Sequence, residues 1–318
     1  MSRFLVTAIG SFSAPSVISV LHQNNNYVCG TDIYPKEWHH TSKACDNFYQ
    51  VELAISPHFI NQILEICYKE EIDYIIPLTD VEIDTFCDNR DLFEMNKIKI
   101  LMPPSNFLKI ARNKFLLSEK FKNDNTVLVP PYILSDNWGS KSLIAECDLI
   151  AKPVNGRSSE GLIKLKKGDD ITTVISTKSY IIQDMIDGPV ITVDYVRDIY
   201  DNDFSIPRRE LIRTKNGAGT TVEIFSDNQI KNIVSHIGHN LGCIGCVNME
   251  FIYNNGSYYL IDINPRFSAG VAFSIFAGYN MVLSHILSCT DCKILDPIKY
   301  NRQIIEKVHK EVCNIVFN

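Results

Sequence analysis

Polar residues alternate with apolar ones in the segment YYLIDINPRFSAG. Asp262, Asn264 and Arg266 occupy every second position, so in a β-strand their side chains lie on one face. The earlier segment CVNMEF carries Asn248 and Glu250 with the same spacing. Acids, amides and a guanidinium on one face are typical of a site that binds a metal ion and a phosphate group.

The two segments predict a β-hairpin that turns at Asn255-Gly256. Facing residues of an antiparallel pair lie on one side of the sheet, so both polar sets share a face only if paired residue numbers have an even sum, such as 250 with 262. A two-residue turn would place Glu250 opposite Ile261 and bury a charge. The sequence therefore predicts an odd loop of three or five residues.

In this arrangement Glu250, Asp262 and Asn264 converge on one cation. Hard oxygen ligands without histidine or cysteine suit Mg²⁺, which often shares its shell with phosphate oxygens, and Mn²⁺ is the alternative ion. Arg266, one step further along, could contact a transferring phosphoryl group. An ordinary charged surface is the alternative interpretation, but it would not require acids on both strands followed by an Asn-Pro-Arg sequence.

A loop rich in glycine and serine joins two strand-like runs in LIAKPVNGRSSEGLIKL. Gly156 and Gly161 match the first half of a P-loop, but Leu162 and Ile163 stand where lysine and serine or threonine should follow, which excludes a Walker A motif. Backbone N–H groups of such a loop can bind phosphates, and Lys152 can reach them from the preceding strand. A simple turn is the alternative.

The segment YIIQDMIDGP is an apolar strand that ends in Gln183, Asp184, Met185 and Ile186. The backbone of this strand exit could pair with a purine while Met185 and Ile186 pack on the base. An ordinary strand exit is the alternative.

Composition limits the classes of protein. A chain of 318 residues with 45% hydrophobic and 21% charged residues indicates a globular protein of two or three domains or subdomains. The net charge of −6 argues against a general nucleic-acid binder. The chain has no signal-like N-terminus and no apolar run of eighteen residues, and its ten cysteines indicate reduced thiols. We therefore expect a cytoplasmic protein with no nucleic-acid or membrane partner.

The first hundred residues alternate predicted strands and helices, which is typical of a parallel α/β domain. Gly10, Asp32, Thr79 and Asp80 follow predicted strands, at the edge where open parallel sheets bind ligands, although plain turn formation explains them equally well. The first turn has only one glycine, which disfavours a nicotinamide dinucleotide. A helical stretch is expected after VPPYI, up to Glu146. Strands dominate from about residue 148, and a final helix is expected at about 299–312.

These residues, in this order, resemble the ATP-grasp superfamily, most closely its carbamoyl-phosphate-synthase-like carboxylate–amine ligases. The resemblance covers nearly the whole chain and rests above all on IDINPRFSAG. It implies a fold of α/β and α+β class, with a Rossmann-like pre-ATP-grasp domain followed by two ATP-grasp subdomains. The implied ranges are 1–104 for the first domain, 105–182 for the small (lid) subdomain and 183–318 for the C-terminal subdomain with the metal and acyl-phosphate site.

The resemblance also implies residue roles. Glu250, Asp262 and Asn264 would bind Mg²⁺, and Arg266 would steady the γ-phosphate and the acyl phosphate. ATP contacts would come from two lysines, the loop and the strand exit: Lys114, Lys152, Gly156, Arg157, Ser158, Ser159, Gly161, Gln183, Asp184, Met185 and Ile186.

The basic segment IPRRELIRTKNGAGTT corresponds to a stretch that contributes to the acceptor and phosphate pocket in related ligases. Arg208 and Arg213 are therefore candidate catalytic residues for binding carboxylate or phosphate, and a solvated charged strand is the alternative. One position departs from the family pattern: Val190 stands where the family often has a ribose-binding glutamate. Asp187 or Asp194 would then contact the ribose, or the ribose contact would be weaker.

A second departure is Asp262, which stands where the family usually has the longer glutamate as its second metal-binding acid. The shorter side chain could shift the position of the ion.

The implied reaction is phosphorylation of a small-molecule carboxylate by ATP, followed by attack of an amine on the acyl phosphate. It forms an amide or peptide-like bond and releases ADP and phosphate. The alternatives are another ATP-dependent phosphotransferase, a carbamoyl-phosphate-type enzyme on the same fold, and a catalytically silent nucleotide-binding module. A homodimer is compatible with the sequence.

Zinc is the rival metal. The segment HIGHNLGCIGC (236–246) and the pair Cys289 and Cys292 have the spacing of zinc ligands. Because Cys246 enters the apolar face of the hairpin and the two histidines of the segment lie on an ordinary helix, we expect structural roles for these residues.

Overall fold

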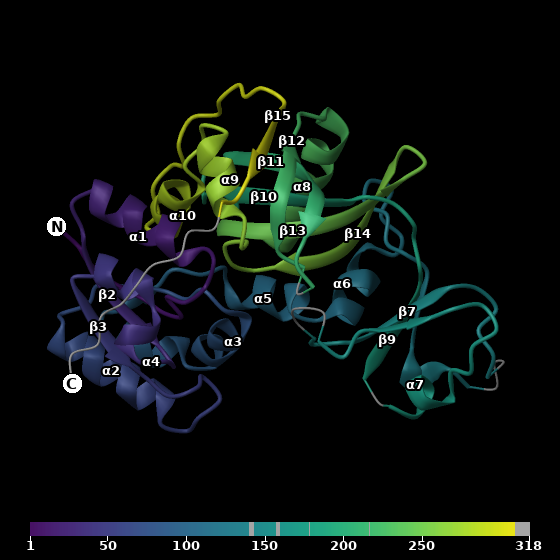
Figure 1. The fold of residues 1–318 in the computed structure, drawn as a ribbon, viewed down its shortest axis with the longest axis horizontal. Helices are drawn as coiled ribbons and strands as arrows, with labels where there is room; N and C mark the ends of the chain where they lie inside the picture. The colour runs from purple at the N-terminus through teal and green to yellow at the C-terminus, as the bar shows by residue number, and fades with distance from the viewer. Residues whose placement is uncertain (140–142, 157–159, 178, 216, 309–318) are drawn as a thin grey trace.

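The computed structural model describes residues 1–139, 143–156, 160–177, 179–215 and 217–308, which form three sheets with their helices (Figure 1). The N-terminal sheet is parallel with strand order β3-β2-β1-β4-β5, as the alternating pattern predicts. Its strands and helices are β1 (Arg3–Val6), α1 (Ala14–Gln23), β2 (Tyr27–Asp32), β3 (Asn47–Gln50), α2 (Phe59–Lys69), β4 (Tyr74–Ile76), α3 (Asp80–Asp88), α4 (Arg90–Met95) and β5 (Lys99–Ile100), with 3₁₀ turns at Lys36–Trp38 and His40–Ala44.

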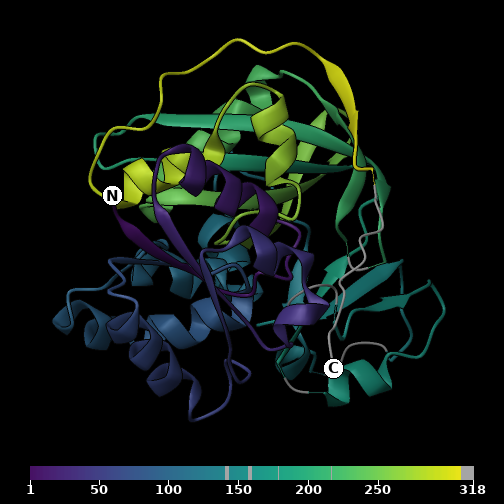
Figure 2. The ribbon, with the colours of Figure 1, turned by 60° about the vertical axis from the view of Figure 1, so that its left-hand side comes forward.

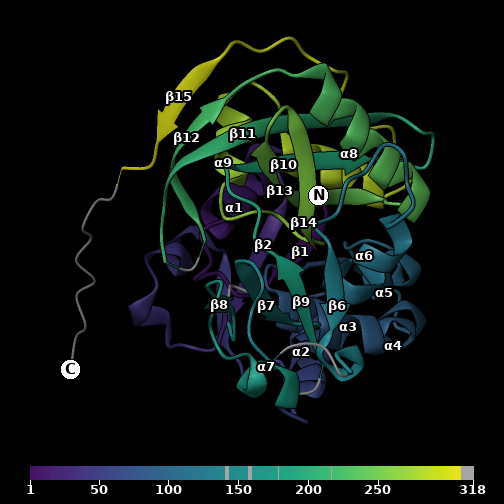
Figure 3. The same cartoon turned by 90° about the vertical axis from the view of Figure 1, so that its right-hand side faces the viewer.

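A second, antiparallel sheet of order β6-β9-β7-β8 forms a lid, which lies below the large sheet in Figure 3. Its elements are β6 (Tyr132–Leu134), a 3₁₀ turn (Ser135–Asn137), β7 (Leu149–Pro153), β8 (Ile163–Leu165), α7 (Thr172–Ser176) and β9 (Tyr180–Asp184). Apolar residues such as Leu149, Ala151 and Ile182 form a core that belongs to the lid alone.

The third sheet is antiparallel with order β14-β13-β10-β11-β12-β15. Odd-numbered residues of its central strand, such as Ile191 and Val193, pack in one core with α8, and even-numbered residues face the opposite side. The elements of this region are β10 (Val190–Arg197), β11 (Asp203–Arg213), β12 (Gly219–Ile224), α8 (Asn228–Leu241), β13 (Gly245–Asn254), β14 (Ser257–Asn264), α9 (Val271–Phe276), α10 (Met281–Cys289) and β15 (Gln303–Glu306).

The N-terminal domain and the third sheet share their cores. Phe107 and Leu117, on the connecting helices α5 (Ser105–Ala111) and α6 (Lys114–Phe121), pack in one cluster with residues of both. On the other side, α1 packs against α10, which Figure 2 shows as a purple helix beside yellow-green ones. These two parts therefore form one packed body, and the lid is attached to it. The residue limits 104 and 182 between domains stay a prediction.

The hairpin of β13 and β14 confirms the predicted pairing but not the predicted loop. Glu250 lies opposite Asp262, and Asn248 lies opposite Asn264. The turn nevertheless has only two residues, Asn255 and Gly256, both with positive φ. A β-bulge between the pairs Glu250–Asp262 and Phe251–Leu260 leaves Ile261 extra and restores the parity, so the expectation of an odd loop was wrong.

Two other expectations were wrong. In place of a final helix at 299–312, residues 303–306 form β15, which pairs with the edge strand β12; residues 309–312 lie outside the described part. Residues that follow Pro131 form β6 rather than a helix. Among the described residues, no helix is long and apolar enough to cross a bilayer.

Candidate active site

A cleft of about 1130 Å³ lies where the N-terminal sheet, the lid and the third sheet meet. Nine of the predicted site residues line it: Lys114, Lys152, Gly156, Arg208, Arg213, Glu250, Asp262, Asn264 and Arg266. These residues come from α6, the lid, the strands β11, β13 and β14, and the exit of β14, so the fold brings together side chains that are up to 152 positions apart in sequence.

Two carboxylates face each other on the floor of the cleft. Glu250 and Asp262 are cross-strand partners, and each is paired with an internal cation. Lys114 Nζ lies 3.1 and 3.0 Å from the two carboxylate oxygens of Asp262, and Arg213 Nη2 lies 3.3 Å from Glu250 Oε2. Burial raises the pKa of Glu250, Arg213 opposes this shift, and the neighbouring Asp262 adds to it. This face therefore concentrates negative charge and attracts cations.

The donor set fits a hard divalent cation. Glu250 and Asp262 offer carboxylate oxygens, and Asn264 offers an amide oxygen while its Nδ2 lies 3.5 Å from Asn248 Oδ1. Among the described residues, no cluster of three or more His, Cys, Asp or Glu side chains could hold a metal. Two acids and an amide leave coordination positions for phosphate oxygens and water, which is how Mg²⁺ is commonly held at nucleotide sites.

Lys152 is buried on β7 and faces this acidic pair from the lid. Its side chain is 9% exposed, and among the described residues its ammonium group makes no hydrogen bond or ion pair. Burial lowers the pKa of Lys152, and Asp262 and Glu250 counteract the shift. A buried ammonium without a partner is costly unless a ligand supplies negative charge.

Arg266 is held by the N-terminal domain. Its Nη2 donates to Asp80 Oδ2 at 2.8 Å, and Nη1 donates to the Phe267 carbonyl at 3.1 Å. Burial alone would raise the pKa of Asp80, but Arg266, Arg112 and Lys114 hold it below its usual value. Arg112 also forms a bidentate pair with Asp84. The guanidinium of Arg266 is therefore oriented before any ligand binds.

Arg208 lies in a buried polar network rather than free in the cleft. Its Nη1 donates to Asp194 Oδ2 at 2.8 Å, and Nε donates to Glu210 Oε1 at 3.2 Å. Asp194 also accepts from Ser274 Oγ and Asn248 Nδ2. Because the side chain of Arg208 is only 2% exposed and doubly paired, its orientation is fixed.

The predicted loop and strand exit are only partly connected to the cleft. Gly156 lines the cleft, and its carbonyl accepts from Lys114 Nζ; Arg157, Ser158 and Ser159 lie outside the described residues. The remaining residues of these two segments do not line the cleft: Gly161, Gln183, Asp184, Met185 and Ile186. The N–H groups of Asp184 and Met185 already donate to the carbonyls of Pro131 and Asp148. A nucleotide role for these residues stays a prediction.

The proposed ribose contact from Asp194 was wrong, because this carboxylate is fully buried in the Arg208 network. Asp187 does not line the cleft either, whereas Val190 does. Ile191 of β10 pairs with Arg209 of β11, so the next position in this register places Val190 opposite Glu210. Glu210 lines the cleft, and its Oε2 is buried with no hydrogen-bond partner among the residues that the structure describes.

The cysteine and histidine cluster has structural roles in the described part of the chain. His236 pairs with Asp124, and Cys246 and Cys289 are buried in an apolar core. No group there could hold a metal, and the nine described cysteines are free thiols. The structural role expected for these residues stays a prediction.

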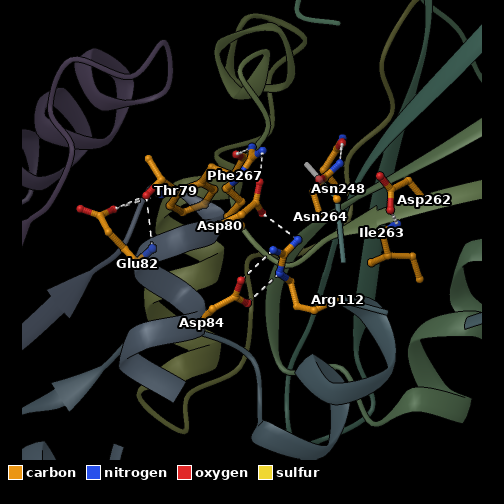
Figure 4. Close-up of polar contacts among 12 residues, drawn as sticks. Thr79, Asp80, Glu82, Asp84, Arg112, Asn248, Asp262, Ile263, Asn264 and Phe267 are labelled. Carbon is orange, nitrogen blue, oxygen red and sulfur yellow. Dashed lines mark hydrogen bonds and ion pairs between the residues drawn. The ribbon is translucent and has the colours of Figure 1, made fainter. Parts of the chain in front are cut away.

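Sequence reasoning missed two contacts that position the site. Asp80 was expected at a ligand-binding edge but not as the partner of Arg266, and Asp194 was assigned to ribose. A local signal marked the first: Thr79 and Glu82 form a capping box at the start of α3, which fixes the strand exit before Asp80 (Figure 4). Asp194 gave no such signal, because its partners come from three other elements.

Comparison with known families identifies two regions. The family model for the ATP-grasp domain matches residues 111–270, and the model for the PylC-like, N-terminal domain matches residues 16–101. The search of curated protein sequences gave no match.

Solved structures with a similar fold cover nearly the whole chain. N5-carboxyaminoimidazole synthetase from Staphylococcus aureus, complexed with ADP, has a TM-score of 0.76 at 15% identity, over 96% of this chain and 82% of that one. Biotin carboxylase from Campylobacter jejuni has a TM-score of 0.72 at 14% identity, over 92% and 72%. Pyruvate carboxylase from Rhizobium etli has a TM-score of 0.75 at 15% identity over 93% of this chain, which spans only 29% of that longer protein. At these identities the likeness concerns the fold.

Proposed function

Since the chain belongs to the ATP-grasp family, we propose that it is an ATP-dependent carboxylate–amine ligase that works through an acyl phosphate. The observation that carries the proposal is the cross-strand pair Glu250–Asp262, with Asn264 beside it, facing the buried ammonium of Lys152 across one cleft. Acids for a cation and unpaired positive charge for phosphates are the two things a bound nucleotide requires.

Glu250, Asp262 and Asn264 would hold Mg²⁺, with Mn²⁺ as a possible substitute. The bound ion would neutralise charge on the phosphoryl groups. Lys114 and Arg213 pair with the two acids in this structure. We infer that they move to phosphate oxygens when the nucleotide and the ion bind, because one carboxylate oxygen cannot serve both partners equally.

The proposed first step transfers the γ-phosphoryl group. A carboxylate oxygen of the substrate attacks the γ-phosphorus, the bond to the bridging oxygen of ADP breaks, and ADP leaves. Lys152 and Arg266 would stabilise the spreading negative charge, and the Asp80 contact holds Arg266 in place for this task.

The proposed second step forms the C–N bond. An amine nitrogen attacks the acyl carbon, phosphate leaves with the electron pair of the C–O bond, and the amine loses a proton to a carboxylate or water. Arg208, which lines the cleft and is paired with Asp194 and Glu210, would bind the acyl phosphate or the acid.

The test is release of ADP from ATP in mixtures of carboxylic acids and amines. We expect turnover that needs both an acid and a divalent cation, and product formation that also needs the amine. Asp262→Ala should abolish turnover. Turnover that survives this substitution would refute the metal assignment, and a stable phosphorylated product that needs no amine would favour a phosphotransferase.

A further inference from the structure

The N-terminal half of the cleft has an apolar wall. Five large side chains line it and are substantially exposed: Phe12, Ile33, Tyr34, Leu53 and Ile55, with exposed fractions of 57, 38, 48, 55 and 75%. They follow β1, β2 and β3, at the carboxyl edge of the parallel sheet, where ligands of such sheets bind. Leaving this apolar surface exposed in a cleft is unfavourable unless a ligand covers it.

The acids of the same wall are paired within the protein. Glu52 accepts from Ser56 Oγ, and Glu82 belongs to the capping box of α3. Asp32 accepts from the N–H groups of Gly10 and Tyr34, and His39 Nε2 lies 3.1 Å from its Oδ1. Asp80 is paired with Arg266. The surface that this half of the cleft offers to a ligand is therefore mainly apolar.

The apolar wall is continuous with the phosphoryl-transfer end. Lys307 lies over the rings of Phe12 and Phe273, at 5.1 and 5.3 Å from their centroids, and donates to the carbonyl of Ala269. Residues Ser268–Gly270, which follow Arg266, also line the cleft. One end thus carries guanidinium groups, and the other end carries exposed apolar side chains.

Because the cleft changes from charged side chains at one end to apolar side chains at the other, we infer that the carboxylate substrate carries a large apolar or aromatic group. This group lies on the wall formed by Phe12, Ile33, Tyr34, Leu53 and Ile55. The inference rests on the proposed function. The carboxylate of this substrate must reach the γ-phosphate near Arg266. Asp80, at the exit of β4, holds Arg266 by an ion pair. The body of the acid then extends over the carboxyl edge of the parallel sheet, where apolar contact with the wall removes surface from water.

The experiment uses the full chain with MgATP and hydroxylamine, which traps an acyl phosphate as a hydroxamate without the natural amine. The acids are 3-phenylpropanoate and octanoate, compared with propanoate and succinate. We expect kcat/KM for the two large acids to exceed that of propanoate by about 10-fold or more, since each buried methylene contributes about 0.8 kcal/mol.

Ile55→Ser tests the wall, and Met95→Ser is its control, because both side chains are 75% exposed in the same domain but Met95 does not line the cleft. Ile55→Ser should raise KM for 3-phenylpropanoate several-fold with kcat nearly unchanged, and Met95→Ser should change neither. When the concentration of ATP is varied instead of that of the acid, neither variant should change the KM for ATP.

Three outcomes would overturn the inference. If succinate or propanoate is activated as well as the large acids, the ligase function stands but the substrate class is wrong. If Ile55→Ser dissociates a dimer in sedimentation and leaves KM unchanged, the wall is an interface between copies. If MgATP binds but no acid yields a hydroxamate, the proposed function fails and this inference fails with it.

Discussion

At the residue scale, Lys152 indicates most clearly that the site binds an anionic ligand. Its ammonium group is buried and has no partner among the described residues, and burial lowers its pKa. Burying this charge is costly, Asp262 and Glu250 offset the cost in part, and an anionic ligand would offset it further. The two acids opposite it are in the reverse situation, because Lys114 and Arg213 already neutralise them.

Lys152→Met should therefore separate stability from function. Methionine fills the same space without a charge, so we expect the free energy of unfolding, measured in urea, to stay unchanged or to rise by up to about 2 kcal/mol. Affinity for ATP, measured by calorimetry, should fall by about 10- to 100-fold, because hydrogen bonds to charged groups contribute about 1.5–3 kcal/mol. Lys167→Met, at an exposed lid position, is the control and should change neither. A clear loss of stability in Lys152→Met would show that the lysine has a structural partner.

At the element scale, the β13–β14 hairpin combines a two-residue turn with a β-bulge. The Asn255-Gly256 turn has the positive φ angles that such two-residue turns need, and the bulge at Ile261 brings Asp262 opposite Glu250. The alternation of polar residues predicted the shared face, because a strand pattern is local. The bulge could not be predicted, since it depends on how two strands pair rather than on either strand alone.

Gly256→Ala should lower the free energy of unfolding by about 1–2 kcal/mol. The φ angle of Gly256 is +80°, and a Cβ would contact nothing within 4 Å, so the loss is purely conformational. Because the turn does not line the cleft, the KM for ATP should stay unchanged. A changed KM would mean that the turn transmits its geometry to the acidic pair.

The helix α10 carries a second prediction, through His285. This residue accepts from the N–H of Cys246 and lies 3.1 Å from the carbonyl of Leu101. Burial lowers its pKa from 6.5 to about 4. Between these pH values the unfolded chain binds more protons than the folded one, so this contribution to stability is complete above pH 6.5 and is lost as the pH falls toward 4, by about 3 kcal/mol.

The measurement compares wild type with His285→Gln, because Glu82 titrates in the opposite sense. Burial raises the pKa of Glu82 to about 7, so its contribution declines as the pH rises from 4.5 to 7. The pH dependence that comes from Glu82 is the same in wild type and in His285→Gln. The difference between their unfolding free energies should shrink as the pH falls from 7 to 4.5, and a difference that does not depend on pH would contradict the assignment.

At the scale of the whole molecule, the ion pair between Asp80 and Arg266 connects the N-terminal domain to the site over 186 positions. No spacing rule could predict it. The sequence predicted the order of the parts and most residues that line the cleft, because the motifs are short and each lies on one element. It failed for contacts made between parts, and at β15, where pairing with β12 overrides a helical pattern.

Asp80→Asn should reduce kcat by about 10- to 100-fold, because Arg266 loses the charge that orients it. The KM for ATP should change little, since Asp80 bonds to Arg266 and is not one of the residues that we assign to the ion. Asp84→Asn is the matched control. Asp84 lies on α3, as Asp80 does, but it is half-exposed and pairs with Arg112. Equal losses in both variants would indicate a general defect of α3 rather than misplacement of Arg266.

The most direct test of the central claim follows the oxygen atoms of the acid. The acid that gives turnover is labelled with ¹⁸O in its carboxyl group and incubated with MgATP and the amine, and the released phosphate is analysed by mass spectrometry. An acyl phosphate requires that one labelled oxygen pass from the acid to the phosphate in each turnover. We predict phosphate with one ¹⁸O atom; phosphate without label, accompanied by ADP and amide, would contradict the account.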